Sequence, residues 1–273
     1  MTLGPIRDVL QSLAGLGRTL EIWWRDDDAV AATPALDRLL AMADRTGAPL
    51  GLAAIPASTE PSLPKRLRTA PHVDVLVHGL RHANHAPPRQ KRAEFGAHRD
   101  PADLARDAQE ALRISKDRFG PALLPVFVPP WNRIAPSLAT ELAGAGYLGL
   151  STFGAPSDPS SLCEGVKRAE SAGVLRIDTH LDPIDWRGTR GLVASERLAD
   201  ALRHASVSRD PVGLLTHHLV YDEALWSFTE SLLELFRGHE AVCLVAPRVV
   251  WRRETLSQNC AGMRATGSAQ ADA

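Results

Sequence analysis

Short apolar runs that alternate with helix-like segments constrain the fold of this 273-residue chain more than any other feature of its sequence. The runs that predict strands span residues 20–24, 50–55, 73–77, 124–128, 148–151, 174–178, 212–216 and 241–246. Helical periodicity fills the intervals at 34–46, 60–69, 101–119, 135–145, 194–206 and 222–237. Strands that alternate with helices of this length form βαβ units, whose strands run parallel in one sheet. The pattern therefore predicts an α/β fold.

The same pattern predicts a single barrel domain over residues 1–253. Seven or eight βα units follow one another without a long polar linker, and single α/β barrels commonly reach about 250 residues. The remaining residues, 254–273, are rich in Ser, Ala, Gly and Gln and are expected to form a disordered tail. The stretches 83–102 and 152–172 have weak periodicity and are expected to be long loops, which in compact folds are often functional.

Charge and hydropathy argue against several classes of partner. The chain carries 31 Lys and Arg against 32 Asp and Glu, so nothing in its charge favours nucleic acid or an anionic membrane. Its apolar runs are shorter than the roughly 18 residues that span a bilayer. The three cysteines form no CxxC pair, which argues against a disulfide framework or a thiolate zinc site. The N-terminal apolar residues have helical spacing rather than the pattern of a signal peptide, so we expect a cytoplasmic protein, either monomer or homodimer.

Chemically reactive side chains collect where the expected strands end. The first strand runs into Arg25 and then into Asp26, Asp27 and Asp28, and the third strand runs into His78. The carboxyl ends of the strands are where barrel enzymes hold their active residues. Three adjacent carboxylates repel one another and are favourable beside a cation. The aspartate run therefore either forms a solvated turn before the next helix or faces a metal ion at the mouth of the barrel.

His78 and His82 have the spacing of a metal-binding pair. Two imidazoles four residues apart on one helical turn face the same side and can bind one ion. Together with a carboxylate from the aspartate run they would form a site that leaves positions open for water and substrate. The alternative is a pair of surface histidines. Zinc is the ion we expect, and the same donors also suit cobalt, nickel or iron.

Further polar and aromatic residues follow the later strands. His217 and His218 come directly after the strand at 212–216, where a histidine either caps the strand or donates a proton to a leaving group. Trp131 and Trp186 lie next to polar strand ends, where they either pack in the core or form a wall on which sugars stack. Asp182 and Asp185 precede Trp186 and would also suit an ordinary turn.

In their order along the chain, these motifs resemble those of the polysaccharide deacetylases, carbohydrate esterase family four. The resemblance implies a distorted (β/α) barrel of about seven strands. From the family's first motif it implies that Asp27 is the general base and that Asp28 binds the metal. From the second, HxxxH, it implies that His78 and His82 are the other two ligands.

The other three motifs are similar to residues 128–131, 182–186 and 215–217. The third, normally Arg-x-Pro-aromatic, would place Trp131 at the substrate. The fourth, Asp-x-x-Asp-Trp, is complete at Asp182, Asp185 and Trp186. The fifth, Leu-x-His, implies that His217 is the general acid.

Two positions depart from the family pattern. The first motif reads Arg-Asp-Asp-Asp-Ala, so an alternative register pairs Asp26 with Asp27. Val128 stands where the family has an arginine that orients the base. Because alternate residues of an extended strand share a face, we expect Arg25 to lie beside Asp27 and to replace that arginine. His85 and His218 have no counterpart to which a role can be assigned.

These residues predict a metal-dependent hydrolase that uses a metal-activated water to remove an N-acyl group, expected to be acetyl, from a carbohydrate or related substrate. Two other functions remain open. One is the hydrolysis of another small cytoplasmic amide or ester, because a fold alone does not decide the substrate. The other is non-catalytic carbohydrate binding on the same fold, which the loss of the arginine at residue 128 would permit.

Overall fold

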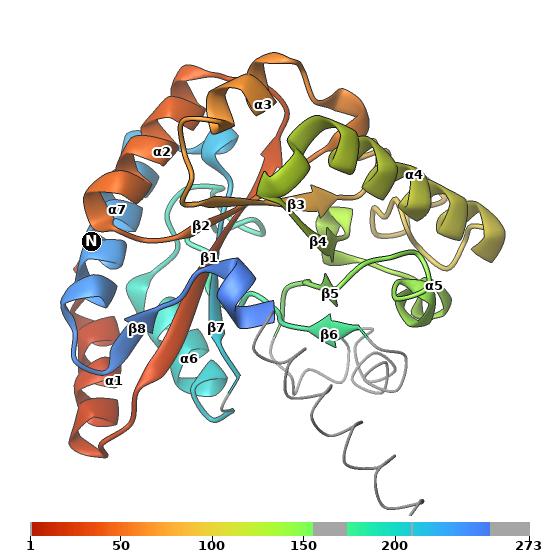
Figure 1. The fold of residues 1–273 in the computed structure, drawn as a ribbon. Coiled ribbons are helices and arrows are strands. Elements are labelled where there is room, and N and C mark those ends of the chain that lie inside the picture. The colour runs from red at the N-terminus through yellow and green to blue at the C-terminus, as the bar shows by residue number, and fades with distance from the viewer. Residues whose placement is uncertain (1, 155–173, 209, 252–273) are drawn as a thin grey trace, which may run out of the picture.

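The computed structural model describes residues 2–154, 174–208 and 210–251, and a curled parallel sheet is its central element (Figure 1). The strands are β1 (Leu20–Ala29), β2 (Leu50–Ala54), β3 (Val73–His78), β4 (Leu123–Val128), β5 (Gly149–Leu150), β6 (Leu175–Arg176), β7 (Val212–Thr216) and β8 (Val242–Leu244). The helices are α1 (Gly4–Gly15), α2 (Pro34–Thr46), α3 (Ser62–Leu67), α4 (Pro101–Phe119), α5 (Pro136–Glu141), α6 (Ser195–Ala205) and α7 (Glu223–Gly238).

The strands pair in the order β6-β5-β4-β3-β2-β1-β7, and β8 pairs with β1 beside this path. Each of these pairings is parallel. The helices lie around the outside of the curled sheet (Figure 1). This arrangement confirms the predicted α/β fold, a distorted (β/α) barrel. All parallel strand ends that carry the predicted site residues therefore meet at one rim.

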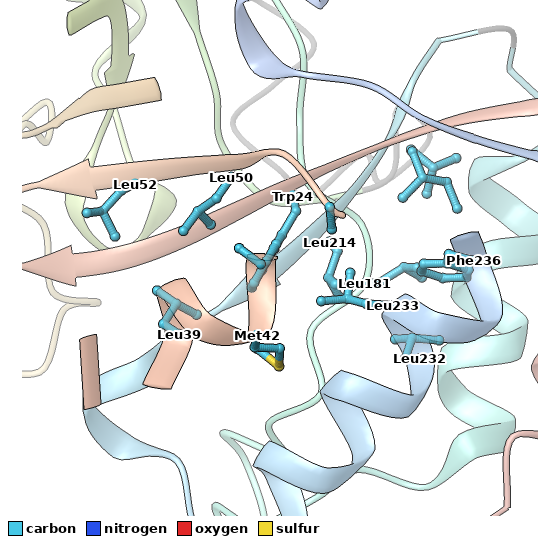
Figure 2. Packing of buried hydrophobic residues seen from close by; sticks show 14 of the residues in the cluster. Trp24, Leu39, Met42, Leu50, Leu52, Leu181, Leu214, Leu232, Leu233 and Phe236 are labelled. Atoms are coloured by element: carbon cyan, nitrogen blue, oxygen red, sulfur yellow. The ribbon is translucent and has the colours of Figure 1, made fainter. Parts of the chain in front are cut away.

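The helix α2 shows how the sequence specifies a packed βα unit. Thr33 accepts a hydrogen bond from the backbone N–H of Leu36 (3.1 Å), Pro34 occupies the first helical turn, and Gly47 ends the helix with a φ of 62°. The apolar face of the helix packs on β1, β2 and β7 (Figure 2). Each leucine buried there contributes about 1.5–3 kcal/mol. The packing of α2 therefore stabilises the position of β1 in the sheet.

The first strand is longer than predicted, because β1 continues through the aspartate run as far as Ala29. A run of acidic residues predicts a turn. Here, however, each of the three carboxylates has an interaction partner, and the backbone of β1 continues to pair with β2. Asp26 pairs in register with Leu52 and Ala29 pairs with Ala54, with an irregularity between them. Asp28 lies in this irregularity and has a φ of 76°. The bend redirects its side chain relative to the two aspartates before it.

Several expectations concern residues outside the described part. Residues 155–172 of the second predicted loop and the predicted tail at 254–273 lie outside it, as do Cys163 and Cys260, whereas Cys243 is a free, exposed thiol. Among the described residues, none of the helices has both the length and the apolar composition needed to cross a membrane.

Candidate active site

A cavity of about 730 Å³ opens at the carboxyl rim of the sheet. The predicted site residues that line it are Asp27, Asp28, His78, His82, Trp131, Asp182, Asp185, Trp186 and His217. Arg25 is the one predicted site residue outside this lining, and its side chain is fully buried behind Asp27. Residues far apart in the sequence therefore meet in one space, as the parallel topology requires.

Asp28, His78 and His82 form a cluster that could hold a metal ion, with one potential ligand atom from each residue within 4.8 Å of the others. The Oδ1 atom of Asp28 lies 3.1 Å from Nε2 of His78 and 3.3 Å from Nε2 of His82. One carboxylate with two imidazoles is a donor set typical of zinc and other divalent transition metals. Of the three consecutive aspartates, Asp28 is the one that lies between the two histidines.

The imidazole of His78 is held in one orientation. Its Nδ1 lies 3.0 Å from the backbone carbonyl of Val128, to which it can donate, so that Nε2 faces Asp28. A hydrogen bond from the far nitrogen is the usual way in which a protein orients a metal-binding histidine. The same carbonyl also accepts from the N–H of Gly79 (3.0 Å). Val128 therefore contributes to the site through its backbone carbonyl rather than through its side chain.

The predicted helical turn between His78 and His82 is wrong. Gly79 and His82 have φ angles of 58° and 56°, and residues 79–82 form no helix. The buried carboxylate of Glu94 shapes this segment by accepting hydrogen bonds from the N–H groups of residues 80 (3.3 Å), 81 (2.8 Å) and 82 (3.1 Å). A Cβ at Gly79 would lie 2.3 Å from Oε2 of Glu94, so only glycine fits there.

The charges in this cluster favour the metal-binding forms of Asp28 and His82, whereas those around His78 favour its protonated form. Burial raises the pKa of Asp28, but the hydrogen bond from His78 and the charges of His78, His217 and His82 outweigh it, and the pKa is lowered. Burial and the charge of His78 lower the pKa of His82. For His78, burial lowers the pKa, but Asp27 and Asp28 raise it by more. An ionised Asp28 and a neutral His82 are ready to coordinate.

Arg25 lies against Asp27, as the spacing along an extended strand predicts. Its Nη2 donates to Oδ2 of Asp27 (3.0 Å), and its Nε lies 2.9 Å from Oδ1. The guanidinium also donates to Oδ1 of Asn132 (2.7 Å) and to Oγ of Ser151 (2.8 Å). Asn132 lies in a left-handed conformation with a φ of 56°, and the sequence pattern did not point to it. The result is a buried carboxylate in a fixed position at the cavity wall.

Asp26 faces away from the cluster and joins β1 to β7. It accepts hydrogen bonds from Oγ1 of Thr216 (2.6 Å) and from the N–H of His218 (3.0 Å), and its Oδ1 lies 2.5 Å from Nδ1 of the same histidine. Burial lowers the pKa of His218, but Asp26 raises it by more. His218 is thus held by a buried pair with Asp26 and has a structural role. In the sequence, the only sign of this role was a second histidine directly after His217.

His217 also lines the cavity, with Trp186 packed edge-on against it at 4.9 Å between ring centroids. Nε1 of Trp186 donates to Asp182 (2.7 Å), which also accepts from the N–H of Ile184 (2.9 Å). Burial raises the pKa of Asp182, against the opposing effects of His217 and of these hydrogen bonds. Asp185 pairs instead with Arg197 (3.1 Å) and so holds the loop.

Trp131 lies beside the metal-binding cluster, with its ring centroid 4.3 Å from that of His82. Its φ of 55° is a left-handed conformation that directs the residue out of the path of β4. Trp131 and Trp186 therefore each contact one histidine of the cavity. Trp186 is 44% exposed, which leaves a large aromatic surface available to a ligand.

Comparison with known proteins gives matches at the level of structure only, because no family model and no curated protein sequence matches this chain. A Mycobacterium smegmatis protein assigned as a polysaccharide deacetylase superposes with a TM-score of 0.63 at 13% identity, covering 89% of this chain and 92% of that protein. A family 4 acetyl xylan esterase from Clostridium thermocellum, solved with a cobalt ion, gives 0.53 at 12% identity, with 85% and 90% coverage.

A third structure shows that this fold also occurs without activity. A mutant of a family 4 pseudoenzyme, described as having restored enzymatic activity, gives a TM-score of 0.54 at 13% identity and covers 85% of this chain and 68% of that protein. Likeness at these identities establishes architecture, and function depends on the residues of the site. This chain thus has the fold of the polysaccharide deacetylases and family 4 carbohydrate esterases, as the order of its motifs predicted.

Proposed function

We propose that this protein is a metal-dependent hydrolase that removes an N-acyl group, acetyl in the simplest case, from a carbohydrate. The observation that carries the proposal is the set of side chains that line one cavity. The cluster of Asp28, His78 and His82 shares the cavity with the buried Asp27 carboxylate and with His217. A metal-binding cluster, a base and an acid are the three parts that hydrolysis of an amide by activated water needs.

In this mechanism Asp28, His78 and His82 would hold a divalent ion, with zinc as our first choice. Such an ion supplies Lewis acidity, which makes water more acidic and an acyl carbonyl more electrophilic. Asp27 accepts the proton of the attacking water at a carboxylate oxygen that keeps a free lone pair beside its bond to Arg25. As the C–N bond breaks, His217 donates a proton to the leaving amine nitrogen.

The pair of tryptophans supports a carbohydrate as the substrate. Trp131 and Trp186 line the same cavity from different segments of the chain. Aromatic faces pack well against the C–H surfaces of sugar rings. The Arg25–Asp27 pair favours a hydrolase over the non-catalytic alternative, because that alternative rested on the absence of an arginine at residue 128. A carbohydrate-binding protein has no need of a carboxylate held in this way.

Metal content tests the first step of the proposal. Protein purified without a nickel column should contain about one ion per chain, and the His78→Ala/His82→Ala variant should contain none. The matched control is His85→Ala/His98→Ala, which removes two exposed histidines of the neighbouring loop that do not line the cavity. A wild-type protein that stays free of metal after dialysis against zinc would contradict the proposal.

Acetate release then tests the reaction. The zinc-loaded wild type should release acetate from N-acetylglucosamine oligomers, and the double histidine variant should not. A small acetamide and a small acetate ester serve as parallel substrates. If only these are hydrolysed, the protein is a hydrolase of small molecules and the carbohydrate assignment is wrong.

Replacing Glu94 with glutamine should weaken zinc binding by about tenfold, the low end of effects seen for residues that orient metal ligands. The amide loses the charge that attracts the N–H groups of residues 80–82, so the backbone that carries His82 is held less well. Competition against a fluorescent chelator measures the affinity. Glu141→Gln, an exposed substitution at the end of α5, is the control. Equal affinities in the two variants would contradict this role for Glu94.

A further inference from the structure

Two arginines of the cavity form no ion pair with any of the described carboxylates. Arg133, Arg187 and Arg197 all line the space beside the proposed metal cluster. Arg197 pairs with Asp185 at 3.1 Å. Among the residues that the structure describes, neither Arg133 nor Arg187 takes part in an ion pair. Arg133 donates from Nη1 to the backbone carbonyl of Arg92 (2.8 Å), which orients the guanidinium without neutralising it.

The two guanidinium groups line the same cavity, where each adds positive charge. Burial lowers the pKa of Arg133, and the charge of Arg187 lowers it further. The two residues come from different segments, one just after β4 and the other in the turn between β6 and α6. Like charges that line one cavity repel each other, and a negative charge between them replaces the repulsion by attraction.

The carboxylates of the cavity already have other partners. Asp27 is bound by Arg25, and Asp28 faces the two histidines. Asp185 is paired with Arg197, and Asp182 receives the N–H of Trp186. Among the described residues, no ion pair joins a carboxylate of the cavity lining to Arg133 or Arg187. A negatively charged ligand would supply the counter-charge at this place.

Each of the two arginines lies close in sequence to one of the two tryptophans of the cavity. Arg133 follows Trp131 by two residues, Arg187 directly follows Trp186, and all four residues line the cavity. A sugar ring held by the tryptophans would thus share the cavity with both guanidinium groups. Guanidinium groups bind carboxylate and phosphate oxygens through paired hydrogen bonds, which makes them selective for such anions.

We propose that the acylated substrate carries an anionic group, a carboxylate or a phosphate, which Arg133 and Arg187 bind together. This inference rests on the proposed function, since it names the class of substrate for the same cavity. The anionic group lies on the sugar or its immediate neighbour, and the acyl group faces Asp28, His78 and His82. A neutral N-acyl sugar would leave the two guanidinium groups without a counter-charge.

Three probes and three proteins test the proposal. The probes are N-acetylglucosamine, its 6-phosphate, and N-acetylmuramic acid, which carries a carboxylate on a lactyl group. The proteins are the wild type, Arg133→Gln/Arg187→Gln, and Arg190→Gln, which removes an exposed arginine from the same turn as Arg187 but outside the cavity lining. Calorimetry measures binding to the metal-free and zinc-loaded forms, and acetate release gives kcat/KM.

The wild type and Arg190→Gln should favour at least one anionic sugar over the neutral one by about tenfold, both in Kd and in kcat/KM. The double variant should lose this preference while its kcat/KM for the neutral sugar changes less than the preference does. Raising the salt concentration from about 0.05 M to about 0.3 M should reduce the preference in the wild type, because salt screens charges at a cavity mouth. The anionic sugar with the larger preference over N-acetylglucosamine, the phosphate or the carboxylate, identifies the kind of anion that the site binds.

Failure of this inference differs from failure of the proposed function. Equal binding and equal rates for all three sugars, or a preference that survives in the double variant, would overturn the anion site and leave the hydrolase intact. Arginine-dependent binding of an anionic sugar without any acetate release would overturn the hydrolase and support the anion site.

Discussion

Asp27→Asn should lower kcat/KM by about a thousandfold, which is in the middle of the range expected for loss of a general base. The variant should keep one metal ion per chain. Asparagine has nearly the shape of aspartate, so it can still lie beside Arg25, but its amide cannot accept the proton of the attacking water. Metal stoichiometry by mass spectrometry and acetate release by an enzyme-coupled assay measure the two quantities on the same preparation.

The control for this experiment is Asp74→Asn. Asp74 is also buried and paired with an arginine, Arg248, but it lies outside the cavity lining. It should lower stability and leave kcat unchanged. If Asp27→Asn loses its metal, then Asp27 is a ligand and the assignment of the base is wrong. If it keeps both metal and full turnover, the chain uses another base.

Arg25→Met is expected to have the second large effect, on folding as well as on turnover. The side chain is fully buried and donates to Asp27, Asn132 and Ser151. Methionine fills much of the volume but leaves the buried Asp27 without its partner. Breaking a buried ion pair from one side typically costs about 3–5 kcal/mol. Urea unfolding of the metal-free protein should show a loss of this size.

The effect on turnover separates positioning of the base from stability alone. In folded Arg25→Met, kcat should fall while KM changes little, because Asp27 is displaced but the substrate-binding walls are unchanged. Arg25→Lys restores the charge without the paired geometry and should give an intermediate kcat. A folded Arg25→Met protein with the kcat of the wild type would show that Arg25 has no part in the reaction.

The order of strands and helices was predictable from the sequence because apolar periodicity records burial directly. The helix from Pro34 to Thr46 begins and ends where its capping residues indicate. The end of β1 was not predictable in this way. A strand that ends in three acidic residues violates the usual pattern, and it is stabilised by the bond of Asp26 to Thr216 on β7 and by the pairing of Asp27 with Arg25.

The partners of the site residues were harder to predict than the residues themselves. Glu94 lies in a long loop without periodicity, and its role depends on three backbone N–H groups that no sequence pattern identifies. The spacing of His78 and His82 was informative, but it suggested a helix, whereas the chain brings the two rings together with two left-handed residues. The pairing of Arg25 with Asp27 was predictable because it depends only on strand geometry.

The three aspartates at the end of β1 also limit how this strand can evolve. Each occupies a different environment: Asp26 bonds to β7, Asp27 bonds to Arg25, and Asp28 faces the histidines. The three residues are chemically identical, so the environment of each carboxylate is set only by its position along the strand. Insertion or deletion of one residue ahead of the run would shift all three carboxylates by one position and leave one of the three environments without its aspartate. The length of this segment is therefore constrained as well as its composition.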